Sequence, residues 1–333
     1  MGPQGRGRDR PGGRRGLSRS KVVRAPSPGV AAPRRDALGF ALAFAALLIW
    51  SGWFAVTRLS VTRELGAYDI AALRLGVGTV VLLPLFLRSA RSIEQAAWRE
   101  GVVLSVCWGA PFVLLLSLGI QLSSAAHAAA ITPTTMPVFA GLIGWAVLGV
   151  RPGWVRGTGF AVIAAGVLAL AATLHTPGRP IDAWIGNASL LSAALLWALY
   201  TLRVRRTGLT PVQAATLVCL YSSLVYLPIY ALCGVSRLGR APWLEVALQA
   251  FYQGVLVSGV SVIAYSRAIA LIGAGPAAAV VSLVPVAATL LAIPVLGERP
   301  TPFTAAAVAC IAAGALLAAR TPRAAMAVEP ALR

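Results

Sequence analysis

The sequence predicts an all-α integral membrane protein with ten transmembrane helices, arranged as two inverted repeats of five helices. Three observations predict this fold class. Of the 333 residues, 58% are hydrophobic and only 12% are charged, whereas an ordinary soluble domain has about 25% charged residues. Apolar runs of about 20 residues, the length that crosses a bilayer, alternate with short polar breaks. The second half of the chain also repeats the pattern of the first.

The chain begins with a basic segment. Residues 1–36 hold ten of the 29 Lys and Arg residues, spread among Gly, Pro and Ser. Such a composition cannot bury enough apolar surface to fold, so we expect residues 1–36 to be a disordered cytoplasmic tail. Residues 321–333 are expected to form a second cytoplasmic tail.

The ten apolar runs divide into two sets. The first repeat, 37–175, contains expected spans at 38–56, 70–87, 101–118, 126–148 and 157–174. The second repeat, 183–320, contains expected spans at 185–202, 212–232, 246–266, 277–296 and 304–319. Small residues such as Gly153 and Gly157 would allow these helices to approach one another closely.

The two sets are related in sequence. Residues 148–170 align without gaps to residues 296–318, and ten of the 23 positions are identical. The same offset pairs Pro137 with Pro285, and an offset one residue shorter pairs Trp50 with Trp197. Because five is an odd number, the second repeat must enter the membrane from the opposite side.

The net charge of +19 is interpreted as a record of orientation. Most Lys and Arg residues lie in the tails and in the loops on one side of the expected bundle, as the positive-inside rule requires of a cytoplasmic face. We therefore expect both termini to be cytoplasmic, in the plasma (inner) membrane of a bacterium. A nucleic-acid partner is not predicted.

Catalytic and metal-binding groups are missing from the expected spans. No Asp or Glu lies deep in any of them, and the four Cys residues show no CxxC spacing. A membrane enzyme would need a nucleophile with a base, or a set of metal ligands. The sequence therefore predicts a protein that is not an enzyme and has neither a metal nor a cofactor.

Two ionisable residues lie within spans. Arg74 is expected either to attract an anionic substrate or pair with Asp69, or to extend its guanidinium to the outer interface. His127 could titrate near neutral pH and couple transport to protons, or it could be a hydrated structural histidine near the outer surface.

Prolines and aromatic residues indicate where a cavity would lie. Pro133 and Pro137 are expected to interrupt the fourth span and Pro285 the ninth; matching kinks in inverted halves point to a substrate site, although ordinary tolerated kinks are the alternative. Tryptophans near expected span ends are assigned to interfacial belts: Trp53, Trp98, Trp145, Trp154, Trp184 and Trp243. The deeper aromatic residues are expected either to line a central cavity or to pack helices together: Trp50, Phe54, Trp108, Phe112, Trp197, Tyr200, Tyr252 and Tyr265.

Several short motifs occur in a set order: Leu-Leu-Ile-Trp-Ser-Gly-Trp at 47–53, Ala-Leu-Arg at 72–74, Pro-Val-Phe-Ala at 137–140, Leu-Leu-Trp-Ala-Leu-Tyr at 195–200 and Leu-Gly-Glu-Arg-Pro at 296–300. In these motifs the chain resembles the EamA-type transporters of the drug/metabolite transporter superfamily, from about residue 38 to 319. The resemblance implies movement of small metabolites through a central cavity. The family's Glu after Leu-Gly is present as Glu298 but is replaced by Val150 in the first repeat, and we expect Glu298 to pair with Arg299 or to cap the tenth helix.

The predicted function is secondary transport, most simply export, of a small-molecule substrate across the lipid bilayer by alternating access around an aromatic cavity. Proton coupling through His127 is an open alternative, and no oligomeric state is predicted. Two other functions fit the pattern. One is a non-transporting scaffold or receptor that uses its basic tail. The other is a flippase for lipids or lipid-linked sugars, which would have a laterally open groove.

Overall fold

A computed structural model describes residues 31–149, 151–172 and 180–319. Within these ranges every regular element is a helix, and the helices are joined by turns and short loops. The first half contains α1 (Ala31–Val61), α2 (Ala67–Ser89), η1 (Ala90–Ser92), α3 (Gln95–Trp108), α4 (Ala110–Gln121), α5 (Ala125–Leu148) and α6 (Trp154–Ala172). The second half contains α7 (Pro180–Val204), α8 (Pro211–Leu232), α9 (Trp243–Gln249), η2 (Ala250–Val260), α10 (Ser261–Ile272), α11 (Ala274–Val281), α12 (Val284–Leu296) and α13 (Pro302–Ala319).

The predicted tails lie largely outside the described residues. Residues 1–30 and 320–333 are not described, and neither is Val150. Helix α1 begins at Ala31, so the last residues of the segment assigned to the basic tail are helical.

The spans confirm the predicted fold class. In the described part of the chain, nine helical segments are long and apolar enough to cross a membrane, and the shorter apolar helix Pro302–Ala318 takes the place of the tenth. Four of these segments combine helices that follow each other closely: α2 with η1, α3 with α4, α9 with η2 and α10, and α11 with α12.

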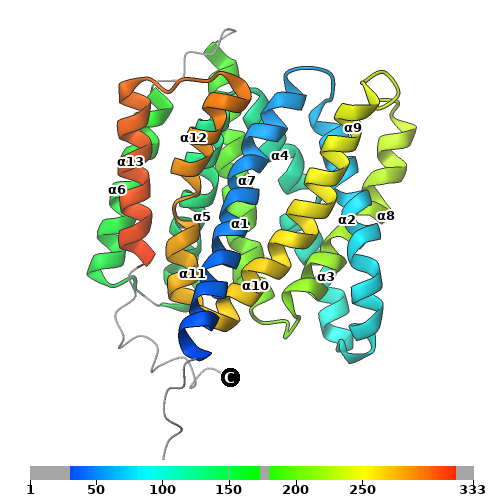
Figure 1. The fold of residues 1–333 in the computed structure, drawn as a ribbon, viewed down its shortest axis with the longest axis horizontal. Coiled ribbons are helices and arrows are strands. Elements are labelled where there is room, and N and C mark those ends of the chain that lie inside the picture. The colour runs from blue at the N-terminus through cyan, green and yellow to red at the C-terminus, as the bar shows by residue number, and fades with distance from the viewer. Residues whose placement is uncertain (1–30, 150, 173–179, 320–333) are drawn as a thin grey trace, which may run out of the picture.

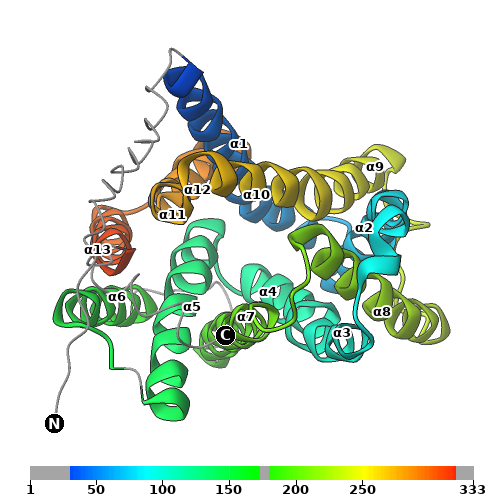
Figure 2. The same ribbon diagram turned by 90° about the horizontal axis from the view of Figure 1, so that it is seen from below.

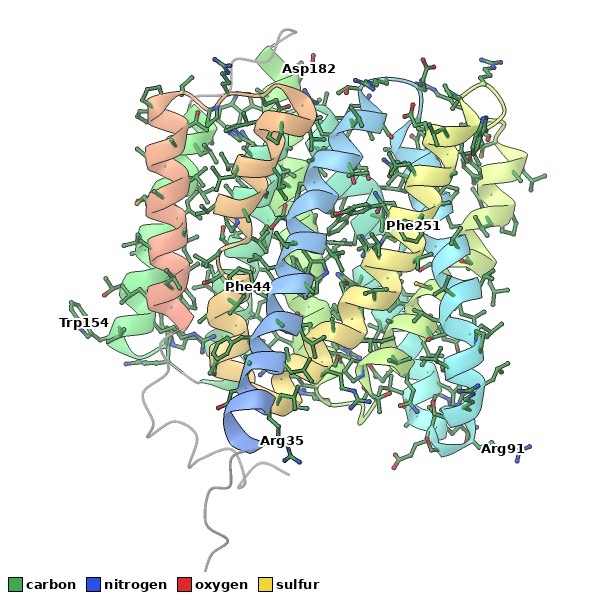
Figure 3. The ribbon with its side chains drawn as sticks, viewed as in Figure 1. Arg35, Phe44, Arg91, Trp154, Asp182 and Phe251 are labelled. Atoms are coloured by element: carbon green, nitrogen blue, oxygen red, sulfur yellow. The ribbon has the colours of Figure 1, made fainter. Side chains whose placement is uncertain are left out.

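The two halves run through the bundle in opposite directions. Figure 3 places Arg35, near the start of α1, at the lower end of the bundle and Asp182, near the start of α7, at the upper end. The first helix of each half therefore enters from a different side, as an inverted repeat requires. We call these two ends of the bundle the Arg35 end and the Asp182 end.

Helices α2 and α8 are the corresponding second helices of the two halves, and they pack against each other. Each begins with the same local structure: the backbone N–H of Gly66 donates to Asp69 Oδ2 at 2.8 Å, and that of Thr210 donates to Gln213 Oε1 at 2.9 Å. Such a bond back to the N-cap stabilises the first turn of a helix. Each helix also contains a proline at the same distance from this cap, Pro84 in α2 and Pro228 in α8.

The third span of each half departs from regular α-helix. In the first half, Gly109 separates α3 from α4, with φ −91° and ψ −134°. A Cβ on Gly109 would lie 1.8 Å from Ser222 Oγ of α8 and 2.3 Å from the Ser105 carbonyl oxygen, so only glycine fits there. In the second half, η2 is an 11-residue π-helix. Such segments are rare and are often found at functional sites.

The prolines predicted to interrupt spans differ in their local structure. Helix α5 runs without a break through Pro133 and Pro137. Pro285 instead lies in the first turn of α12, directly after the end of α11. The fourth and ninth spans therefore differ: the ninth is broken next to Pro285, whereas the fourth is continuous at Pro137.

Helices α6 and α13, the fifth helices of the two halves, lie side by side at one edge of the bundle (Figures 1 and 2). A Cβ on Gly159 of α6 would lie 2.6 Å from the backbone N of Ala318, and one on Gly314 would lie 3.0 Å from the Gly159 carbonyl oxygen. Close backbone contact at small residues is typical of helices packed within a bilayer. At the expected pair, Gly153 and Gly157, an added Cβ would instead meet no atom of the described residues within 4 Å.

Candidate functional site

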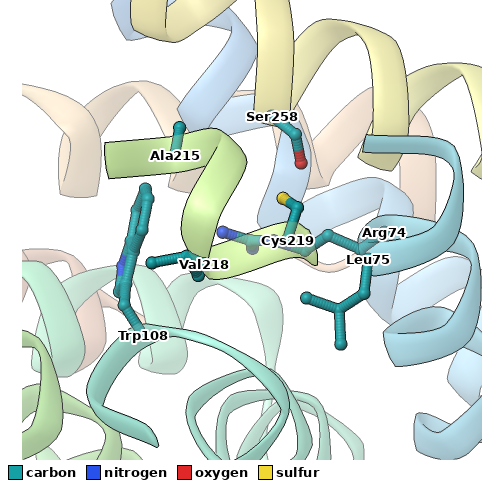
Figure 4. A pocket seen from close by; sticks show the side chains of 7 residues that line it. All are labelled: Arg74, Leu75, Trp108, Ala215, Val218, Cys219 and Ser258. Carbon is teal, nitrogen blue, oxygen red and sulfur yellow. The ribbon is translucent and has the colours of Figure 1, made fainter. Parts of the chain in front are cut away.

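A small cavity lies where α2, α3, α8 and η2 meet. It is lined by Arg74, Leu75, Trp108, Ala215, Val218, Cys219 and Ser258 (Figure 4). Its free space holds about one water molecule. The cavity therefore takes its lining from the second and third spans of both halves.

The lining follows the internal repeat. The caps of α2 and α8 and their internal prolines correspond at one common spacing: Gly66 with Thr210, Asp69 with Gln213, Pro84 with Pro228. The same spacing pairs Arg74 with Val218 and Leu75 with Cys219, and all four line the cavity. The cavity thus lies between equivalent positions of the inverted halves, and the charge of Arg74 has no counterpart at Val218.

Aromatic rings surround the guanidinium of Arg74. Its Cζ lies 4.4 Å from the ring centre of Trp53, 5.5 Å from that of Trp108 and 5.8 Å from that of Phe112. These rings come from α1, α3 and α4. The side chain of Arg74 is buried, with 4% of its surface exposed, so it does not extend to the interface. A cation over desolvated rings gains about 0.5–2 kcal/mol for each favourable contact.

Arg74 does not pair with Asp69, the acidic partner considered for it. Among the described residues it forms no ion pair, and its buried Nη1 atom has no hydrogen-bond partner. Asp69 is bound elsewhere: Oδ1 accepts from the Tyr230 hydroxyl at 2.5 Å and from the Arg237 backbone N–H at 2.9 Å, and Oδ2 accepts from Gly66. Asp69 therefore holds the Asp182 end of α2 to α8 and the loop after it.

Two further buried polar atoms have no hydrogen-bond partner in the part of the chain that the structure describes. Trp108 Nε1, a donor, belongs to a residue of the cavity lining, and Ser222 Oγ lies beside the break at Gly109. Buried polar groups in proteins are almost always paired. Trp108 Nε1 and Arg74 Nη1 are thus two buried donors of the cavity lining that have no acceptor among the described residues.

The aromatic residues predicted to line a cavity form two groups. Around Arg74, the Trp108 ring stacks on Tyr200 at 4.7 Å and lies 6.2 Å from Phe112, which in turn is 6.0 Å from Trp197. Phe54 joins this group through Trp53, at 5.4 Å.

The second aromatic group lies between α1 and the eighth span. Trp50 contacts Tyr265 edge to face at 5.1 Å and donates from Nε1 to Ser261 Oγ at 2.9 Å. Tyr252 donates to the Ile49 carbonyl oxygen at 3.0 Å. These three residues join helices and do not line the cavity around Arg74.

The assignment of Trp53 to the interfacial belt is wrong. The residue is 6% exposed and contacts Arg74. The reason is the length of α1, which runs to Val61 because its polar last turns are paired inside the bundle. Gln253 donates to Thr57 Oγ1 at 2.9 Å, and Gln249 donates to Ser60 Oγ at 2.8 Å.

His127 lies apart from the cavity lining. It is 5% exposed, and its Nε2 is 2.9 Å from the carbonyl oxygen of Leu170 in α6. Its backbone N–H is capped by Ser124 at the start of α5. The imidazole therefore connects α5 to α6. Within the described residues, no group of three or more His, Cys, Asp or Glu side chains is arranged to hold a metal ion.

An ion pair joins the two halves at the Asp182 end. Arg58 Nε lies 3.4 Å from Glu298 Oε1, and Arg58 Nη1 donates to the carbonyl oxygens of Ile120 at 2.9 Å and Gln121 at 2.6 Å. Glu298 was expected to pair with Arg299 or to cap the tenth helix. Its observed partner is Arg58, which the fold brings from 240 residues away.

A second ion pair joins the halves at the Arg35 end. Arg203, near the end of α7, donates from Nε and Nη2 to the two carboxylate oxygens of Glu100 in α3, both at 3.1 Å. This pair is more exposed, at 49% and 37% of the side-chain surface, than Arg58 and Glu298 at 22% and 28%. One ion pair at each end of the bundle thus joins the first half to the second.

Inverted five-helix halves around a charged cavity define a multi-pass membrane protein with the architecture of a transporter. The sequence model of the EamA-like transporter family matches residues 37–172 and 184–320. The chain therefore belongs to this family and is a membrane transporter of the drug/metabolite transporter superfamily, with a small-molecule substrate.

Solved structures agree with the fold. Of these, 24 chains match. One, titled only "Crystal structure of protein", is 18% identical and aligns with a TM-score of 0.52 over 89% of this chain and 99% of its own. The comparison with curated proteins found no match.

Proposed function

We propose that the protein is a secondary transporter that exports a small metabolite by alternating access around the Arg74 cavity. The Arg35 end and both termini would be cytoplasmic, in a bacterial plasma membrane. The observation that carries the proposal is the position of the cavity between equivalent residues of two inverted halves, where rocking of one half against the other exposes a site to each side in turn. The small size of the cavity favours a small solute over a lipid.

The two ion pairs are proposed to be the gates. Opening the Asp182 end requires separation of Arg58 from Glu298, and opening the Arg35 end requires separation of Arg203 from Glu100. Exposed pairs contribute about 0–1 kcal/mol, whereas Arg58 is less exposed and also binds two helix-terminal carbonyl oxygens. The Arg58–Glu298 gate at the Asp182 end is therefore the stronger of the two.

Cys219 provides a reporter for this test because its thiol lines the cavity. The other cysteines, Cys107, Cys233 and Cys310, are first replaced by Ala or Ser. In oriented proteoliposomes, labelling of Cys219 by a membrane-impermeant thiol reagent is then followed from each side. Arg58→Gln is expected to speed labelling from the Asp182 side and Arg203→Gln from the Arg35 side.

The control is Arg63→Gln, which removes a charge from an exposed residue near Arg58 and should change neither rate. Acceleration of labelling from both sides by one substitution would indicate a channel, and no acceleration by either substitution would contradict the assignment of the gates. Both results contradict alternating access controlled by these pairs.

Export itself is tested by metabolite profiling of cells with and without the protein. Deletion of residues 1–30 should leave export intact, whereas a scaffold acting through its tail would lose its function.

A further inference from the structure

We infer that the Arg74 cavity binds a small organic monoanion, whose carboxylate pairs with the guanidinium and whose flat apolar body lies against Trp108. This inference rests on the proposed function, since it names the class of substrate for the same site. It depends on charge, on the geometry of the guanidinium and on the size of the cavity.

The charge of Arg74 is uncompensated. The carboxylate of Asp69 is used by Tyr230 and by two backbone N–H groups. Glu100 and Glu298 are held by Arg203 and Arg58 at the two ends of the bundle. A buried cation without a counter-ion is costly, so an anion that enters the cavity gains a partner that the described part of the chain does not provide.

The aromatic rings leave Nη1 of Arg74 without an acceptor among the described residues. Ring faces attract the positive charge of a guanidinium, but its N–H donors lie in the guanidinium plane and need acceptor atoms. Figure 4 shows the Arg74 side chain reaching from α2 across the cavity toward Trp108, with Val218 and Cys219 beside it. Nη1 is buried without a partner, and a carboxylate is the acceptor whose geometry matches the guanidinium fork.

The size and lining of the cavity limit the rest of the ligand. Space for about one water molecule accommodates a carboxylate oxygen, and the remainder of the ligand needs the stacked pair Trp108 and Tyr200 to move apart. Rings prefer flat partners, so an aromatic or planar body suits this place. Arg74 can neutralise one negative charge only, which favours a monoanion over a dianion.

The test compares benzoate with benzamide, which has nearly the same shape without the charge. Binding is measured by calorimetry on the purified full-length protein in detergent. We expect benzoate to bind at least about tenfold more tightly than benzamide, a difference of about 1.4 kcal/mol. Arg74→Gln should reduce the ratio of the benzamide and benzoate dissociation constants to about one. Arg74→Lys keeps the charge but loses the planar guanidinium, so its ratio should be intermediate. Arg63→Gln should retain the wild-type preference.

Equal affinity for benzoate and benzamide, no detectable binding of benzoate, or an unchanged preference in Arg74→Gln would each overturn the inference. A titration with sodium chloride alone tests whether the site binds an inorganic anion. Binding of chloride together with equal affinity for benzoate and benzamide would assign the site to an inorganic ion and contradict the organic ligand. If Arg74→Gln does not fold, the wild-type and Arg74→Lys preferences still decide. Equilibrium binding does not depend on transport. A negative binding result would therefore contradict the anion site alone, whereas a negative Cys219 labelling result would contradict the proposed gates.

Discussion

Two charged side chains near the start of α2 are buried, and their surroundings give them different roles. Asp69 accepts three hydrogen bonds from residues of α8, the loop after it and its own helix cap. Arg74 has aromatic neighbours and an unpaired Nη1. A charge whose hydrogen bonds are all supplied by the protein stabilises the fold, whereas a charge left unpaired is available to a ligand.

Tyr230→Phe is predicted to lower the free energy of unfolding by about 1.5–3 kcal/mol, the range for a hydrogen bond to a charged group. The neighbouring Tyr226 is the control, because its hydroxyl donates to the exposed carbonyl of Tyr68 at 3.0 Å. Tyr226→Phe should cost about 0.5 kcal/mol. Unfolding in detergent measures both, and equal costs would contradict a structural role for Asp69.

Gly109 is the residue on which the break between α3 and α4 depends. Gly109→Ala places a methyl group against Ser222 Oγ and the Ser105 carbonyl oxygen, and we predict a loss of about 1–3 kcal/mol in the free energy of unfolding. Adding Ser222→Gly to Gly109→Ala should recover only part of the lost stability, because the Ser105 carbonyl oxygen still contacts the new methyl group. Gly144→Ala, with no neighbour within 4 Å, serves as the control and should be neutral.

At the scale of helices, α6 and α13 approach each other closely through their backbones, at Gly159 and Gly314. Lipid solvates apolar side chains as well as another helix does, so association within a bilayer depends on close van der Waals contact. Such contact needs small residues at the crossing point. The sequence motif Gly153-x-x-x-Gly157 has the same composition but lies outside the contact.

Gly159→Val is therefore predicted to separate α6 from α13 and to lower the melting temperature, because backbone atoms of Ala318 and Gly314 lie within 2.9 Å of its Cβ position. Gly157→Val, two residues away on the same helix, should leave the melting temperature nearly unchanged. A larger effect at residue 157 would show that the motif packs against another surface. Thermal unfolding of the two purified variants makes the comparison.

At the scale of the whole molecule, the two ion pairs differ in exposure and therefore in their response to salt. At about 1 M salt the Debye length falls to about 3 Å, which screens exposed charges most strongly. The Arg203–Glu100 pair is the more exposed. Labelling of Cys219 from the Arg35 side should therefore accelerate with salt more than labelling from the Asp182 side. The reverse order would show that exposure does not set the strength of the gates.

The sequence predicted much of the fold, and it singled out Arg74, which the structure places in the candidate site. Hydropathy and the internal repeat were sufficient for the spans and their inversion, because crossing a bilayer imposes both length and composition. Arg74 was recognisable as a charge within a span. Trp53 was misplaced because Thr57 and Ser60 look like the polar end of a helix, although both are bonded to glutamines of the eighth span. The Arg58–Glu298 pair depends on tertiary contact, for which local sequence has no signal.

The unequal pair Arg74 and Val218 makes the two halves differ in charge where they meet at the cavity. The two halves follow the same order of spans, although their third and fourth spans differ in local structure, and the single guanidinium belongs to one half only. Exchanging the two residues, with Arg74→Val and Val218→Arg together, would move that charge to the equivalent position of the other half while the amino-acid composition stays constant. An anion at the proposed site would then reach the guanidinium more easily from the opposite side of the membrane. The sidedness of a carrier of more than three hundred residues would therefore depend on two of them.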